Sequence, residues 1–174
     1  SLELLSLAAK QRIVVIGATG GVGGYAVQMA VARGAHVIAT VRGDSDEARH
    51  LGAEEVYDTK AKDAIETIRA YHPEGVDAVL DLVNGKDAIQ RDAEILKPGG
   101  KLVSTIYAAD EGWFAARKIT GHNISSMTNP LSTTKGLDQI ARMLKDGIIT
   151  ARVRTTARLE ETGQVIEKLR NGGL

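Results

Sequence analysis

Short apolar runs alternate with amphipathic stretches along most of the chain. The apolar runs predict strands at Ile13–Ile16, Val37–Thr40, Val76–Leu82 and Lys101–Ile106. Helical spacing predicts helices at about 22–33, 45–51, 61–71 and 86–96. This alternation predicts an α/β fold, a three-layer doubly wound parallel sheet of about six strands with helices on both faces.

Turn residues support these boundaries. Gly34, Gly52 and the Pro98–Gly100 cluster each stand where a helix should stop before the next strand, and Asp44 or Ser45 would cap the second helix. Right-handed crossovers then place the carboxyl ends of the strands along one edge, where a ligand enters the crevice at the switch in strand order. The candidate functional residues are therefore those directly after each strand.

Composition narrows the function classes. The chain has 174 residues, of which 43% are hydrophobic and 25% charged, and we expect one domain over residues 1–174. Its formal net charge is zero and it contains no basic run, so we expect neither nucleic acid nor a membrane as partner. Without cysteine, and with four scattered histidines, no metal site is expected. No signal peptide or transmembrane window is seen, which favours a cytoplasmic location.

The most informative segment is RIVVIGATGGVGGY, residues 12–25, which runs from a strand through a glycine-rich turn into a helix. It can be read as GxxGxxG from Gly17, or as AxGxxG from Ala18. A helix N-terminus with unpaired N–H groups, approached over glycines without Cβ atoms, binds a pyrophosphate. The turn therefore predicts a Rossmann dinucleotide site, whose cofactor-binding residues are Ala18, Thr19, Gly20, Gly21, Val22 and Gly23.

The end of the second strand indicates which dinucleotide binds. A carboxylate about 20 residues after the turn would accept a bond from the ribose 2′-OH of NAD, but this stretch holds no acid and is followed by Arg42. Thr40 and Arg42 together predict a 2′-phosphate site, and hence NADP(H) rather than NAD(H). Two alternatives stay open: Arg42 is a solvated loop residue, or Asp44 folds back toward the ribose.

After the fourth strand, Asn84 should face the adenosine or pyrophosphate edge of the crevice, and Asp81 either shares that role or caps the next helix. Other chemistries lack their motifs. There is no GxSxG elbow of a hydrolase, no GK[ST] ending of a P-loop, and no Tyr-x-x-x-Lys pair of a short-chain reductase.

Four segments in this order resemble zinc-independent medium-chain dehydrogenase/reductases of the quinone oxidoreductase-like branch: GATGGVGGYAVQMA, GAEEVYD, GVDAVLDLVNG and LKPGGKLVST. The resemblance covers nearly the whole chain. It implies an NADPH-binding domain of an oxidoreductase that passes hydride to a quinone, enone or enoyl-type substrate, with Thr105 and Ile106 beside the nicotinamide ribose. One difference is that a basic 2′-phosphate partner of the family falls where this chain has Asp46 and Glu47.

The resemblance also implies a second, GroES-like catalytic domain that supplies much of the substrate pocket, and nothing in this chain corresponds to it. We therefore expect cofactor binding without turnover by the chain alone, and the sequence identifies no catalytic residue. The alternative is an NmrA-like or short-chain-type protein that binds a dinucleotide as a redox sensor.

Two further features lie near the C-terminal half. Residues 121–128 predict a polar edge strand through which a homodimer could form, as related enzymes join such edges. Trp113 and Phe114 stand side by side in a predicted loop. They either wall the nicotinamide pocket, or fill a gap, or contact the missing domain, and the last two interpretations are favoured.

Overall fold

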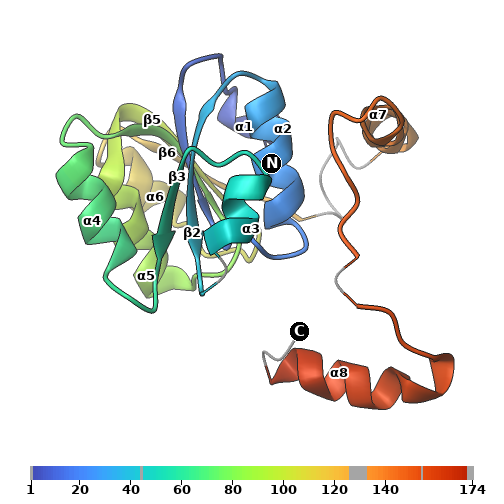
Figure 1. The fold of residues 1–174 in the computed structure, drawn as a ribbon. Helices are drawn as coiled ribbons and strands as arrows, with labels where there is room; N and C mark the ends of the chain where they lie inside the picture. The colour runs from blue at the N-terminus through green and yellow to red at the C-terminus, as the bar shows by residue number, and fades with distance from the viewer. Residues whose placement is uncertain (1, 44, 126–132, 154, 172–174) are drawn as a thin grey trace.

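Six parallel strands form one sheet in the order β3-β2-β1-β4-β5-β6 (Figure 1). The computed structural model describes residues 2–43, 45–125, 133–153 and 155–171. The strands are β1 (Arg12–Ile16), β2 (His36–Val41), β3 (Glu55–Asp58), β4 (Val76–Asp81), β5 (Leu96–Ser104) and β6 (Thr120–Asn123). The predicted doubly wound Rossmann-type fold is confirmed.

Helices cover both faces of the sheet. They are α1 (Leu2–Leu5), α2 (Gly23–Ala32), α3 (Ser45–His50), α4 (Ala64–Tyr71), α5 (Lys86–Asp92), followed by the 3₁₀ turn η1 (Ala93–Ile95), and α6 (Glu111–Ala115). Alternate residues of β1 face opposite layers, because successive side chains of a strand point to opposite sides. Val15 packs in the layer of α1, α2 and α3, and Val14 in the layer of α4, α5 and α6.

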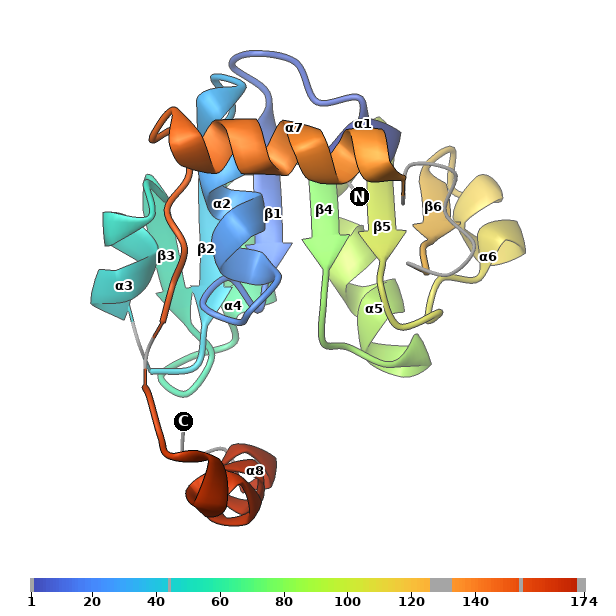
Figure 2. The same cartoon turned by 90° about the vertical axis from the view of Figure 1, so that its right-hand side faces the viewer.

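Strand order places the candidate crevice. β1 pairs with β2 on one side and with β4 on the other, so the order reverses between β1 and β4. All five pairings are parallel, so the carboxyl ends of the strands share one edge. Figure 2 shows the arrowheads of β1, β4 and β5 together at this edge. The reversal is where doubly wound sheets bind ligands.

The helix stops are confirmed at two of three places. Gly34 and Gly52 follow α2 and α3 with φ values of +73° and +99°, a region that favours glycine. The Pro98–Gly100 cluster is different, because it lies within β5. The register of β5 against β4 shifts between the Val76 and Ala78 pairings, so the cluster is an irregularity in the strand rather than a turn before it. β5 also ends at Ser104, two residues earlier than predicted.

Trp113 and Phe114 lie in the short helix α6, and the predicted loop is wrong here. The Asp110 side chain caps this helix by accepting from Trp113 N at 3.1 Å. Phe114 is fully buried, and a Cβ on Gly121 would come within 2.7 Å of its ring. Phe114 therefore fills the space between α6 and β6, as the packing interpretation expects.

Two helices near the C-terminus were not predicted. These are α7 (Thr134–Lys145) and α8 (Thr162–Arg170), which follows the 3₁₀ turn η2 (Leu159–Glu161). Neither contains a buried residue in the part of the chain that the structure describes, and Figure 1 shows both standing away from the sheet. Within the described ranges, no helix has the length and apolar character needed to cross a membrane.

Candidate functional site

The glycine turn directly follows β1 and opens α2. Gly17 leaves the strand with a φ of +82°, and Gly20 N donates to Gly17 O at 3.1 Å. Gly24 N then donates to Gly20 O at 3.0 Å as the helix begins. The N-cap residue Val22 gives no side-chain cap, so the first amides of α2 have no acceptor within the helix. Val22 is 60% exposed, which leaves this end of the helix open to a ligand.

Gly23 brings the start of α2 close to the end of β1. A Cβ at Gly23 would collide with the carbonyl oxygen of Gly17 and lie 2.9 Å from the backbone of Ala18. Ala18 is buried, and its N–H donates to Thr40 O at 3.1 Å, which ties the turn to the end of β2. The turn is thus held rigidly between two strands, with the dipole of α2 pointing out of it.

A pocket of about 430 Å³ lies beside this turn at the carboxyl edge. It brings together the ends of β1, β2, β3 and β4 and the helices α4 and α5, and two predicted site residues, Thr40 and Asn84, line it. Its lining residues are Ile16, Thr40, Thr59, Lys60, Ala61, Lys62, Asp63, Ala64, Ile65, Asn84, Ala88, Arg91 and Asp92. This volume falls within the range of about 300 to 1,000 Å³ that is typical of small-molecule pockets.

Asp81 shapes the loop after β4 and does not cap α5, whose N-cap is Gly85. Asp81 is fully buried, and its Oδ1 accepts from Val83 N and Asn84 N, both at 2.9 Å. Asn84 is thereby turned toward Asp92, to which its Nδ2 donates at 2.7 Å. The capping interpretation of Asp81 was therefore wrong, while Asn84 lies where it was predicted, at the pocket.

Asp81 and Asp92 form a buried carboxyl pair. Burial, and then the neighbouring Asp81, raise the pKa of Asp92 to about 7. Asp81 Oδ2 is buried without a hydrogen-bond donor in the part of the chain that the structure describes. A proton on Asp92 supplies that donor below about pH 7, because two neighbouring carboxylates repel each other when both are ionised.

The loop after β2 carries Arg42, which is exposed to solvent. Exposure is consistent both with a 2′-phosphate partner and with a solvated loop residue. The alternative residue Asp44 lies outside the described residues. Gly43 N donates to Asp58 Oδ1 at 3.1 Å, which joins this loop to the end of β3. Lys60 Nζ lies 3.2 Å from where a Cβ of Gly43 would stand. Lys60 is therefore a second cation at this loop.

Sequence reasoning missed Lys60, although a signal was present. Lys60 comes two residues after β3, so applying the strand-end rule to the third strand would have found it. Arg152 was also missed. It comes from the segment after α7, far along the chain, and contacts the carbonyl oxygens of Thr19 and Gly20. No pattern in the sequence indicates that contact.

Thr105 and Ile106 follow β5, one strand further along the same edge. Thr105 N donates to Asp81 O at 3.2 Å, and Ile106 N donates to Ser104 Oγ at 3.3 Å. Ile106 is exposed and Thr105 half-buried. The structure thus brings Thr40, the turn, Asn84 and these two residues to one edge, in the strand order β2, β1, β4 and β5.

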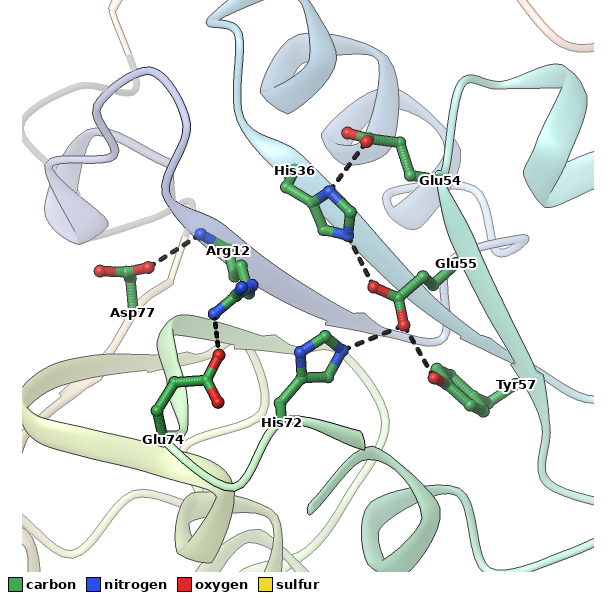
Figure 3. Close-up of polar contacts among 8 residues, drawn as sticks. All are labelled: Arg12, His36, Glu54, Glu55, Tyr57, His72, Glu74 and Asp77. Carbon is green, nitrogen blue, oxygen red and sulfur yellow. Dashed lines mark hydrogen bonds and ion pairs between the residues drawn. The ribbon is translucent and has the colours of Figure 1, made fainter. Parts of the chain in front are cut away.

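The opposite edge of the sheet carries a separate polar cluster (Figure 3). Glu55 accepts from Tyr57 Oη at 2.8 Å and lies 2.7 Å from His36 Nε2 and 3.0 Å from His72 Nε2. Burial alone would raise the pKa of Glu55, but the hydrogen bonds from His36, Tyr57 and His72 outweigh it and lower the pKa. Burial and the Glu55 carboxylate raise the pKa of Tyr57. Glu54 accepts from His36 Nδ1 on the other side of the ring.

Among the described residues, no group of three or more His, Cys, Asp or Glu side chains is arranged to hold a metal ion. The described residues therefore do not fit a zinc site.

Comparison with known proteins gives a consistent result. Residues 21–146 match the family model described as zinc-binding dehydrogenase. A curated relative, the NAD-dependent alcohol dehydrogenase of Saccharolobus solfataricus, is 32% identical over 171 residues, covering 95% of this chain and 49% of the relative. The chain thus spans about half the length of this relative and of the NAD-dependent alcohol dehydrogenase of Sulfurisphaera tokodaii, which it matches at 31% identity.

Solved structures share the fold. A putative enoyl reductase domain of a polyketide synthase is 28% identical with a TM-score of 0.72, covering 89% of this chain and 92% of that one. The quinone oxidoreductase of Coxiella burnetii is 22% identical with a TM-score of 0.84, covering 99% of this chain and 53% of that one. At that identity, the second match supports the fold alone.

Proposed function

The chain belongs to the zinc-binding dehydrogenase family of the medium-chain dehydrogenase/reductase superfamily, and from that premise we propose that it binds NADP(H) for hydride transfer to a quinone, enone or enoyl-type substrate. The observation that carries the proposal is the open glycine turn beside the pocket at the strand-order reversal. The nicotinamide supplies the hydride when bound. The chain's own residues bind and orient the dinucleotide.

Each part of the edge has a task under this proposal. The amides of Gly21 and Val22 donate to the pyrophosphate, aided by the dipole of α2. Thr40 and Asn84 line the pocket that receives the adenosine, and Thr105 and Ile106 flank the nicotinamide ribose. The Asp81–Asn84 hydrogen bond holds the loop after β4 in place.

The preference for NADP(H) rests on charge. Arg42 and Lys60 both carry positive charge at the loop after β2, where the 2′-phosphate of NADP would lie. Against this, the Saccharolobus relative is described as NAD-dependent, and Asp58 brings a carboxylate to the same loop. The backbone amides of Gly43 and Lys60 already donate to Asp58 Oδ1. Asp58 is therefore a weaker acceptor for the ribose hydroxyls.

The substrate class is drawn from the resemblance of the four sequence segments, and the 28% identical match to a putative enoyl reductase domain supports its enoyl part. A homodimer through β6 and a cytoplasmic location are further proposals. β6 lies at the edge of the sheet over Thr120–Asn123, residues 124–125 of the predicted strand are not part of it, and residues 126–128 lie outside the described residues.

Calorimetric titration with NADPH and NADH tests the cofactor proposal. We expect the wild-type chain to bind NADPH more tightly, and Arg42→Ala to weaken NADPH selectively. Arg49→Ala is the matched control, because Arg49 is an exposed arginine of α3 whose ion-pair partner is Asp46. Tighter binding of NADH by the wild type, or equal losses for both dinucleotides in Arg42→Ala, would contradict it.

An activity assay separates the oxidoreductase from the sensor alternative. NADPH oxidation is followed with a quinone and with an enone as acceptor. Turnover by the chain would show that it carries the reaction and would overturn the expectation of binding without turnover. Dinucleotide binding by a longer protein containing this chain, with no oxidation of NADPH by any acceptor of either class, would favour a sensor.

A further inference from the structure

The segment that follows α7 returns to the glycine turn (Figure 2). Ile149 is buried, and Thr150 N donates to Gln28 Oε1 at 2.7 Å. Gln28 Nε2 in turn donates to Thr150 O at 3.3 Å. These bonds attach residues 149–150 to the side of α2. Arg152, two residues later, is therefore carried to the N-terminal end of the same helix.

The Arg152 side chain bridges two parts of the candidate site. Its Nη1 donates to Thr19 O at 3.2 Å and lies 3.4 Å from Gly20 O, and its Nη2 forms an ion pair with Glu47 of α3. The Arg152 side chain is 13% exposed and that of Glu47 is 24% exposed. Gly24 leaves the room for this arrangement, since a Cβ there would collide with Arg152 Nη1.

Glu47 is the carboxylate most relevant to cofactor choice. It lies in the first turn of α3, which begins just after the loop that carries Arg42. A carboxylate that reaches the region after the second strand would accept hydrogen bonds from the ribose hydroxyls of NAD and would repel the 2′-phosphate of NADP. Because one guanidinium reaches both the turn and Glu47, the carboxylate lies close to the phosphate-binding backbone.

We propose that the Arg152–Glu47 ion pair is a specificity element for the 2′-phosphate of the dinucleotide, an inference that rests on the proposed function. Arg152 neutralises Glu47, which its guanidinium joins to the turn, and so removes the carboxylate charge that would repel the 2′-phosphate. The partly buried setting makes this effect stronger than it would be for an exposed pair. The C-terminal segment thus completes the cofactor site from a distance in sequence.

The test compares NADPH and NADH binding by calorimetry in the wild-type chain, Arg152→Gln, Glu47→Gln and the double variant. In Arg152→Gln we expect NADPH to bind about 10-fold more weakly, the usual size of one charge-assisted contact, with NADH changed less than about twofold. Glu47→Gln should bind NADPH at least as tightly as the wild type. The double variant should recover part of the loss seen in Arg152→Gln, because the repelling acid is gone.

Arg33→Gln is the matched control. It removes another arginine–glutamate pair, Arg33 with Glu3, at the opposite end of α2, and should leave both affinities unchanged. Arg152→Lys keeps the charge and should retain a part of the NADPH preference. Thermal melting of each variant shows whether it is folded, and Glu47→Gln provides an independent reading if Arg152→Gln is not.

The outcomes separate the two proposals. Tighter NADH binding by the wild type contradicts the NADP(H) proposal, whereas the role of Arg152 is read from the change in the NADPH-to-NADH ratio between variant and wild type. An equal loss for both dinucleotides in Arg152→Gln, or weaker NADPH binding in Glu47→Gln, would overturn the specificity role. Absence of binding by either dinucleotide to the wild type would overturn both.

Discussion

Asn84 donates from Nδ2 to Oδ2 of Asp92 at 2.7 Å, and this bond fastens the loop after β4 to the end of α5 at the wall of the candidate pocket. Asp92 also faces the buried carboxyl of Asp81, and burial together with that neighbour raises its pKa to about 7. The pocket wall therefore contains a carboxyl that holds a proton near neutral pH.

This pair makes stability depend on pH. Between the ordinary value of 3.8 and about 7, the native state keeps a proton that the unfolded chain has released, so the free energy of unfolding falls as pH rises. The slope that Asp92 contributes is at most about 1.4 kcal/mol per pH unit. Urea denaturation from about pH 5 to about pH 8 should show Asp92→Asn gaining stability relative to the wild type as pH rises.

Asp87→Asn provides the control on the same helix, because Asp87 is exposed in the first turn of α5. The free energy of unfolding of Asp87→Asn should differ from that of the wild type by a constant amount over this pH range. A constant difference between Asp92→Asn and the wild type at every pH would show that the Asp81–Asp92 pair holds no proton.

The two central glycines of the turn should respond differently to a methyl group. Gly23→Ala forces a Cβ into the backbone of Gly17 and Ala18, and we expect a loss of about 2 kcal/mol or more in unfolding free energy. At Gly21, a Cβ would meet no atom within 4 Å, so Gly21→Ala should change stability by less than about 0.5 kcal/mol. Chemical denaturation measures both, and similar losses would refute the close approach of α2 to β1.

Removal of the Phe114 side chain should lower the free energy of unfolding strongly. Phe114→Ala leaves a cavity between α6 and β6, which should cost about 3 to 5 kcal/mol. Leu137 of α7 is 69% exposed, and Leu137→Ala should cost far less. Thermal melting of the two variants checks this contrast, and a small effect at Phe114 would mean that its packing is misassigned.

The cluster at the opposite edge should matter in acid. The pKa of Glu55 is lowered in the native state, so its stabilising contribution is present above the ordinary value of 4.5 and is lost as pH falls through the native value. Glu55→Gln should therefore be less stable than the wild type at neutral pH, and the difference should shrink below about pH 4.5.

Denaturation series at several pH values would measure this convergence. Glu94→Gln is the comparison, since Glu94 forms an exposed ion pair with Arg69 and should contribute little at any pH. Curves for Glu55→Gln that stay a fixed distance from the wild type in acid would contradict the account of the cluster.

Much of the fold could be predicted because its elements are local patterns. Ile13–Ile16 is a β-branched run between turn residues, and the glycines at 34 and 52 mark helix ends by the φ values they adopt. Asn84 and Thr40 were found by one rule, that residues after parallel strands share an edge. These predictions need only the local sequence patterns and the order of the elements along the chain.

The rest depends on contacts between distant segments. Arg152 contacts the turn although more than a hundred residues separate them in the sequence. No local sequence pattern indicates that its ion-pair partner is Glu47. Asp92 looks like an ordinary polar residue at a helix end until β4 places Asp81 beside it. Helix α7 is different, because Leu137, Ile140 and Leu144 stand at helical spacing and the sequence therefore does carry a local signal for it, although neither α7 nor α8 has a buried residue in the described structure.

The most direct test of the central claim is a crystal structure of the chain grown with NADPH. We predict the pyrophosphate against the amides of Gly21 and Val22, the adenosine in the pocket lined by Thr40 and Asn84, and the 2′-phosphate near Arg42. A dinucleotide bound away from the carboxyl edge of β1 and β4, or a turn closed over by side chains in the presence of excess NADPH, would contradict it.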